Sequence, residues 1–167
     1  MSKKMNIKEI DNLKGKTEPL SDSEAGKVAA LIRKNTQDVN EGEYSSKDIE
    51  ELMDFATPEK IQEEMKRGYL IMLLDDKEDL IGCALVVRRG IKLIIKTLQV
   101  KTTYSRKGYG SLLYKQCENL FRNMRMNEIE VQVPKFPRAE AFYKGRGFVK
   151  TGNPTPKDLH FAMFKYI

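Results

Sequence analysis

Three short apolar segments in the middle of the chain limit the fold more than any other feature of this sequence. They are rich in Ile, Leu and Val, as strands are, and they span Tyr69–Leu74, Leu80–Arg89 and Ile91–Val100. The polar turn Asp75–Asp79 joins the first two segments, and Gly90 joins the second to the third. Because connections this short bring consecutive strands together in opposite directions, the three segments predict an antiparallel meander.

The flanking sequence predicts further strands and several helices. Before the meander, one strand and three capped, amphipathic helices are expected over Met5–Ile10, Glu24–Asn35, Ser46–Phe55 and Pro58–Arg67. After it, a long helix, a strand, a short helix and two closing strands are expected over Tyr109–Met124, Glu128–Val133, Pro137–Lys144, Phe148–Thr151 and Leu159–Ile167. We therefore expect one α/β (α+β) domain over residues 1–167, with a mixed, mostly antiparallel sheet of about seven strands flanked by about four to five helices.

Composition argues against several classes of protein. The 167 residues are 40% hydrophobic and 32% charged, which supplies a core without disulfides. No apolar run approaches the ~20 residues of a membrane span, and none follows the basic N-terminus as in a signal peptide, so we expect a soluble cytoplasmic protein without a membrane partner. Cys83, Cys117 and the single histidine, His160, are interpreted as packed or surface residues, and we expect no metal.

The net charge of +6 is distributed unevenly. Residues Gln37–Glu64 hold ten acidic side chains and two lysines, a net charge of −8 within an otherwise basic chain. This asymmetry indicates an anionic ligand for the basic part and a cationic one for the acidic part, unless the charges only keep helix surfaces in water. Basic residues are mixed with acidic ones, and no set of aromatic residues for base stacking accompanies them, which argues against a nucleic-acid partner.

The turn before the long helix has the residues that phosphate binding requires. A strand ends near Val100, and the chain passes two basic residues and two glycines before the helix begins. Main-chain N–H groups at the start of a helix lack internal partners and lie at its positive end, where phosphates bind. An ordinary glycine-rich turn has the same composition, and no P-loop or dinucleotide fingerprint is complete here. The candidate phosphate-binding residues are Ser105, Arg106, Lys107, Gly108, Tyr109, Gly110 and Ser111.

Two motifs together resemble the GNAT superfamily of N-acetyltransferases. Its Gln/Arg-x-x-Gly-x-Gly/Ala signature falls on Ser105–Gly110, and its Asn-x-x-Ala-x-x-Phe/Leu-Tyr-x-x-x-Gly-Phe pattern falls on Phe136–Phe148. The sequence departs from the family at two places, because Ser105 replaces the usual Gln or Arg and Phe136 replaces the usual Asn. We expect these changes to alter the contacts with the pyrophosphate and the pantetheine arm of the cofactor.

The resemblance implies an acetyl-CoA co-substrate, a primary amine acceptor and direct transfer within a ternary complex. The third meander strand and the strand Glu128–Val133 would splay apart to admit the pantetheine arm, much as an added strand pairs with a sheet edge. Tyr143 matches the family tyrosine that protonates the departing CoA thiolate. Main-chain groups that pair with the arm, one of them an oxyanion donor, would come from Leu98, Gln99 and Val100. A non-catalytic acyl-CoA-binding or regulatory module of the same fold is the alternative.

The general base and the acceptor stay open at this point. Ile91–Val100 contains no carboxylate, so the candidate bases are a water chain or one of four glutamates, Glu41, Glu43, Glu128 and Glu130. In this family the early helices border the acceptor side, so the acidic Gln37–Glu64 segment favours a cationic acceptor such as a polyamine, an amino-sugar or a lysine-rich peptide. We expect a monomer or a homodimer.

Overall fold

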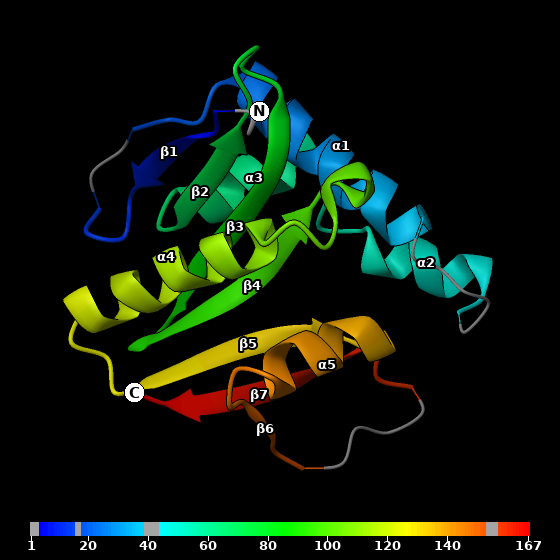
Figure 1. The fold of residues 1–167 in the computed structure, drawn as a ribbon, viewed down its shortest axis with the longest axis vertical. Helices are drawn as coiled ribbons and strands as arrows, with labels where there is room; N and C mark the ends of the chain where they lie inside the picture. The colour runs from blue at the N-terminus through cyan, green and yellow to red at the C-terminus, as the bar shows by residue number, and fades with distance from the viewer. Residues whose placement is uncertain (1–3, 16–17, 39–43, 153–156) are drawn as a thin grey trace.

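The computed structural model describes residues 4–15, 18–38, 44–152 and 157–167. Within them one seven-stranded sheet runs in the order β1-β2-β3-β4-β5-β7-β6 (Figure 1). Its strands are β1 (Asn6–Asp11), β2 (Tyr69–Leu74), β3 (Leu80–Arg89), β4 (Lys92–Val100), β5 (Glu128–Pro134), β6 (Val149–Lys150) and β7 (His160–Tyr166). All neighbours are antiparallel except β4 and β5, which are parallel. This confirms the predicted mixed, mostly antiparallel sheet.

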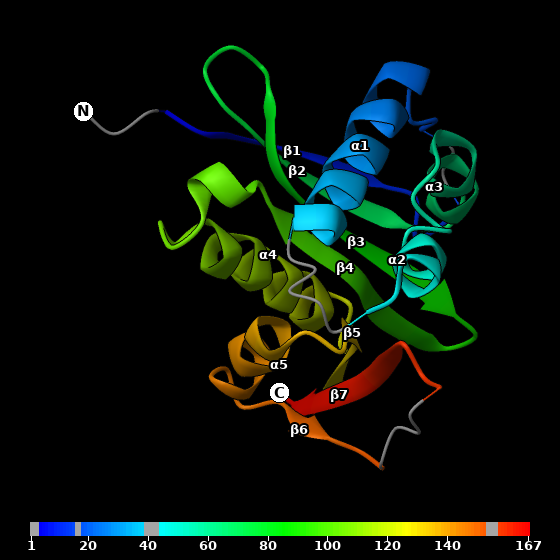
Figure 2. The same ribbon diagram turned by 90° about the vertical axis from the view of Figure 1, so that its right-hand side faces the viewer.

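Five α-helices of the described chain cover the two faces of the sheet (Figure 2). Helices α1 (Asp22–Asp38), α2 (Ser46–Leu52) and α3 (Pro58–Met65) lie on one side, and α4 (Tyr109–Asn123) and α5 (Pro137–Lys144) lie on the other. The helix starts follow their capping residues. The Ser21 hydroxyl oxygen accepts a hydrogen bond from the Glu24 N–H at 3.1 Å, and Thr57 caps α3 in the same way at 3.2 Å.

The sheet is buried on both faces, and each face has its own apolar cluster. In β2, Ile71 and Leu73 pack toward α4, whereas Leu70 and Met72 pack toward α1 and α3. This double burial explains why the strand is almost uninterrupted apolar sequence rather than an alternating one. Each fully buried aliphatic side chain of this kind stabilises the fold by about 1.5–3 kcal/mol.

The end of α2 and the turn after β4 differ from the prediction. Helix α2 ends at Leu52 rather than at Phe55, because the chain must turn and then extend at Thr57, which has φ −118° and ψ 151°, before a proline. The turn after β4 contains a short 3-10 helix, η1 (Thr102–Tyr104), which the sequence analysis missed. No helix in the described part of the chain is long and apolar enough to cross a bilayer.

Strands β4 and β5 separate soon after they meet, as predicted. Only two residue pairs join them, Ile94 with Glu130 and Ile95 with Val131. A bulge at the same place adds Lys96 to β4, because Ile95 pairs with Val86 of β3 while Thr97 pairs with the preceding residue, Leu85. Bulges bend a strand and increase its twist, so β4 turns away from β5 beyond this point. The gap that results holds the candidate active site.

Candidate active site

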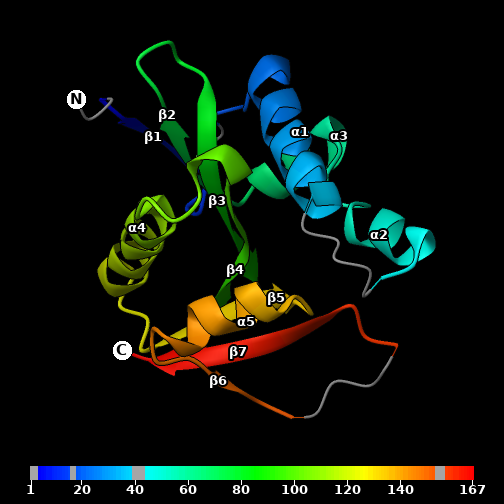
Figure 3. The same cartoon turned by 45° about the vertical axis from the view of Figure 1, so that its right-hand side comes forward.

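A cavity of about 790 Å³ lies where β4 and β5 separate. Figure 3 shows β4 with α4 on one side of this opening and β5 with α5 on the other. The cavity is lined by the last five residues of β4, the start of α4, α5, and parts of α1, α2 and β7. It therefore reaches from the α4–α5 side of the sheet to the α1–α2 side.

The loop before α4 holds its backbone in a conformation that leaves the helix start open. Gly108 is the N-cap residue with φ +85° and makes no side-chain cap, and Arg106 also has a positive φ of 60°. The first amides of α4 are therefore free of a capping side chain and lie at the positive end of the helix dipole. Of the seven predicted phosphate-binding residues, six line the cavity. Lys107 does not, and its ammonium lies 5.4 Å from the centre of the Tyr104 ring instead.

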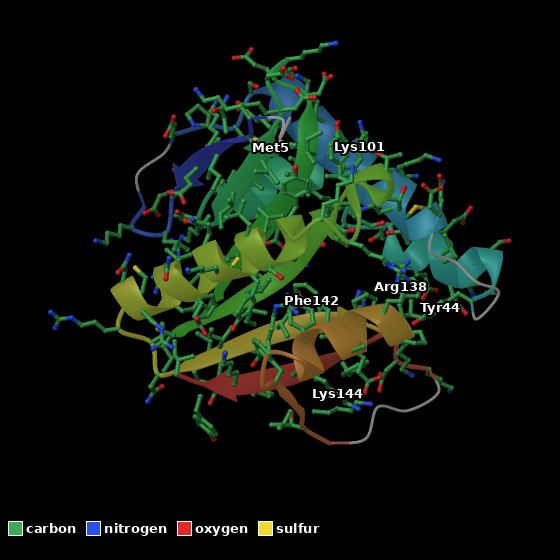
Figure 4. All side chains as sticks on the ribbon, in the orientation of Figure 1. Met5, Tyr44, Lys101, Arg138, Phe142 and Lys144 are labelled. Atoms are coloured by element: carbon green, nitrogen blue, oxygen red, sulfur yellow. The ribbon has the colours of Figure 1, made fainter. Side chains whose placement is uncertain are left out.

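Helix α5 is held against the start of α4 by one aromatic ring. Phe142 lies between the two helices in Figure 4, and a Cβ at Gly110 would lie only 3.1 Å from its ring. Arg146 stacks on that ring at 3.6 Å, donates to the Phe142 carbonyl at 2.8 Å and donates to the Ser111 hydroxyl. Gly110 is thus needed for close packing, and Arg146 brings a positive charge to the end of the cavity beside α4.

Tyr143 lines the cavity, although it is only 6% exposed. Its ring packs edge-on against Phe142 and Phe148, with centroids 5.1 and 5.3 Å apart. Burial raises the pKa of the Tyr143 phenol above its ordinary value, and the neighbouring Cys117 adds to the shift. The phenol therefore keeps its proton at neutral pH and can donate it to a strong base that forms in the cavity.

The predicted pantetheine-pairing residues Leu98, Gln99 and Val100 all line the cavity. Asn35 of α1 reaches across and donates through Nδ2 to the Val100 carbonyl at 2.8 Å and to Gln99 Oε1 at 3.1 Å. Because the Val100 carbonyl can only accept, the amide orientation of Asn35 is fixed. Asn35 is 5% exposed, and its Oδ1 has no hydrogen-bond partner among the described residues.

Lys96 and His160 line the cavity but were not among the predicted site residues, as is also true of Tyr104, Arg138 and Arg146. Lys96 lies at the bulge, with its ammonium 3.6 Å from Glu64 Oε1 and 5.0 Å from the centre of the Phe55 ring. His160 of β7, which we interpreted as a packed or surface residue, lines the same cavity. Burial, and then the charge of Lys96, lower the pKa of His160 to about 4, so its imidazole is neutral at pH 7.

Two of the four glutamates considered as general bases are not where that role requires them. Glu128 and Glu130 do not line the cavity, and Glu130 lies 3.7 Å from the Lys92 ammonium instead. Glu41 and Glu43 lie outside the described residues. No described residue of the acidic Gln37–Glu64 segment places a carboxylate in the cavity lining.

Phe136, which replaces the usual family asparagine, has a packing role. It precedes α5 without a side-chain cap, lines the cavity and contacts the Tyr44 ring edge-on at 5.1 Å. Together with Leu52 of α2 it belongs to a small apolar cluster that joins α2 to the start of α5. The departure therefore closes one side of the cavity with a ring rather than with a polar amide. No group of three or more histidine, cysteine or carboxylate side chains in the described chain is placed to hold a metal ion.

A sheet that opens between two parallel strands, beside a glycine-rich helix start, is the arrangement of the acyl-CoA N-acyltransferase fold. Residues 40–166 match the family model described as acetyltransferase (GNAT) domain. The chain therefore belongs to the GNAT acetyltransferase family. A comparison with curated proteins finds no match.

Solved structures show the same fold at low sequence identity. The PaiA N-acetyltransferase of Thermoplasma acidophilum in complex with coenzyme A is 19% identical, with a TM-score of 0.78 over 98% of this chain and 99% of that one. A GCN5-related N-acetyltransferase of Rhodopseudomonas palustris is 17% identical, with a TM-score of 0.75 over 100% and 97%. A GNAT acetyltransferase of Staphylococcus aureus is 15% identical, with a TM-score of 0.71 over 98% and 99%.

Proposed function

We propose that the protein transfers the acetyl group of acetyl-CoA to a primary amine by direct attack within a ternary complex. The observation that carries the proposal is the cavity at the separation of β4 and β5, with the uncapped start of α4 in its lining. A long thioester that ends in a diphosphate fits such a cavity, because the diphosphate meets the amides and the arm continues between the strands. The solved relative in complex with coenzyme A supports this reading.

The phosphate end is held mainly by main-chain groups. The amides of Tyr109, Gly110 and Ser111 at the start of α4 would donate to the diphosphate, and Arg106 and Arg146 would balance its charge. Lys107 is left out, because its side chain lies on Tyr104 rather than in the cavity lining. Such a site needs no side-chain contact from Ser105, which accounts for the replacement of the usual Gln or Arg.

The chemical step takes place near the end of β4. Main-chain groups of Leu98, Gln99 and Val100 would pair with the pantetheine arm, and one N–H there would stabilise the oxyanion that forms when the amine attacks the thioester carbonyl. As the carbon–sulfur bond breaks, Tyr143 donates its proton to the CoA thiolate. The proton that the amine loses goes to water in the cavity, which then returns a proton to the phenolate.

Thiol release from acetyl-CoA over a panel of primary amines tests the proposal. Acceptor-dependent release that falls in Tyr143→Phe would support it. A protein that binds coenzyme A by calorimetry but releases no thiol with any amine would instead be a non-catalytic acyl-CoA-binding module. The lack of a carboxylate in the described cavity lining is the observation that favours this second function.

A further inference from the structure

The charged side chains that line the cavity are all basic. Four of the lining residues carry a full positive charge at neutral pH, and none of the lining residues in the described chain is acidic. Arg106 and Arg146 lie beside the start of α4, on the side proposed for the diphosphate, and Arg138 lies at the start of α5, near Tyr44 (Figure 4). Lys96 lies at the bulge of β4, directly after the last residue that pairs with β5. Its charge therefore needs another explanation.

Lys96 is only partly neutralised by its own surroundings. Its one carboxylate partner in the described chain, Glu64, accepts two hydrogen bonds from Arg89 at 2.8 and 3.1 Å, whereas Lys96 lies 3.6 Å away. Burial alone would raise the pKa of Glu64. The hydrogen bonds from Arg89 and the charge of Lys96 outweigh this effect and hold that pKa below its usual value. One negative charge is thus shared by two cations, which leaves a net charge of +1 beside the cavity.

The surroundings of Lys96 would strengthen its attraction for an anion. The lysine side chain is 16% exposed, and the Phe55 ring covers one side of its ammonium, so solvent screens the charge less than on an open surface. His160 is neutral at pH 7 and can donate one N–H to an acceptor.

We propose that the acceptor amine carries a carboxylate, as an amino acid does, and that Lys96 binds this carboxylate while the amine faces the thioester. A single carboxylate matches the net charge of +1 that Lys96, Glu64 and Arg89 leave together, whereas a doubly charged phosphate is better matched by an arginine pair at a helix start, as Arg106 and Arg146 provide beside α4. A polyamine would be repelled by Lys96. The inference rests on the proposed function, because the ligand is identified as the amine that receives the acetyl group.

Acceptors that differ only in one group test the proposal. Thiol release from acetyl-CoA is measured with a panel of amino acids as acceptors. Each amino acid is compared with its primary amide and with the diamine in which an ammonium group replaces the carboxylate. We expect kcat/KM for the best amino acid to exceed that of its amide by at least about tenfold and that of the diamine by more. The amine of the amide is less basic than that of the amino acid, so more of it is unprotonated and able to attack at neutral pH. Intrinsic reactivity therefore favours the amide and works against the expected preference for the amino acid. An equal or higher value for the amide or the diamine would overturn the proposal.

The matched variants are Lys96→Met and Lys92→Met. Both lysines are on β4 and both lie within 4 Å of a glutamate, but only Lys96 lines the cavity. Lys96→Met should reduce the preference for the amino acid over its amide to about threefold or less, and Lys92→Met should leave the preference as it is. Folding should survive, because Glu64 keeps both Arg89 hydrogen bonds. An unchanged preference in Lys96→Met would contradict the proposal.

A binding measurement separates this inference from the proposed function. His160 is the only histidine, so its imidazole gives one set of proton NMR signals. In protein saturated with coenzyme A, which occupies the phosphate end, the amino acid should shift these signals and its amide should not. A shift without any thiol release would contradict the acetyl transfer but support the carboxylate site. Thiol release with amides, and no shift with amino acids, would leave the transfer intact and overturn the carboxylate site.

Discussion

Replacement of Gly108 by alanine perturbs the loop that we propose to bind the diphosphate, without adding a clash. Gly108 has φ +85°, and no atom lies within 4 Å of the Cβ that alanine would add. The whole effect therefore comes from the backbone, because an L-residue with this φ costs about 1–2 kcal/mol relative to glycine. Residues 105–108 are all exposed, so few packing contacts hold the loop in its present shape. In the free variant the loop should relax and lose little stability.

The cost then returns when coenzyme A binds, because the amides must regain their conformation. A penalty of about 1–2 kcal/mol corresponds to a dissociation constant for coenzyme A that is about 5- to 30-fold higher. Titration calorimetry at low ionic strength measures this directly. Gly108→Asn should recover part of the lost affinity, because asparagine tolerates positive φ better than alanine.

Gly90→Ala is the matched control, since Gly90 also has a positive φ, +63°, and open space for a Cβ. It lies in the β3–β4 hairpin, where the pairing extends to Arg89 and Lys92, so this turn cannot relax. We expect its cost to appear as a loss of about 1–2 kcal/mol in the free energy of unfolding, with coenzyme A affinity unchanged. Equal affinities in the two alanine variants, with both proteins folded, would refute the proposed role of the loop.

Three further predictions concern the cavity. Tyr143→Phe should lower kcat by about 10- to 10⁴-fold with little change in coenzyme A affinity; an unchanged kcat in the thiol-release assay would exclude the role of general acid. Asn35→Ala leaves the Val100 carbonyl without its donor and should lower the free energy of unfolding in urea by about 1–3 kcal/mol; no loss would show that water replaces the amide. His160 has a folded pKa of about 4, below the ordinary 6.5. Its contribution to stability is therefore complete above pH 6.5 and decreases toward pH 4 by up to about 1.4 kcal/mol per pH unit. The free energy of unfolding of His160→Gln in urea should depend less on pH over this range, and a dependence identical to that of the unsubstituted protein would contradict the prediction.

The sheet and the α4 loop are predictable from sequence because their signals are local. The meander depends on short apolar segments and short turns, and the helix start depends on Gly108 and Gly110 followed by an amphipathic run. The end of α2 was placed too late, because Phe55 continues the apolar pattern although the chain has already turned toward Pro58. Here the extended backbone that Thr57 needs to begin α3 outweighed the apolar periodicity that favoured a longer α2.

The side of the cavity that we propose for the amine could not be predicted in the same way. Asn35, Lys96 and His160 come from three elements far apart in sequence, and none lies in a motif. The bulge that adds Lys96 becomes visible only once the faces of β4 are known, because Leu93, Ile94 and Ile95 are all apolar. Leu93 and Ile95 pack on the face of the sheet that α4 covers, and Leu98 and Val100 pack on the same face. The residues of β4 that point to this face therefore change from odd-numbered to even-numbered positions. Because side chains alternate along a strand, this change requires one extra residue between 95 and 98, which is the bulge.

Amide NMR during a coenzyme A titration tests the central claim most directly, namely that the main chain at the start of α4 holds the diphosphate. The account predicts that the amide resonances of Gly108, Tyr109, Gly110 and Ser111 shift most and saturate together. The shifts should be lost with pantetheine, which lacks the diphosphate. Saturable binding of coenzyme A that leaves these four resonances unmoved would contradict the account.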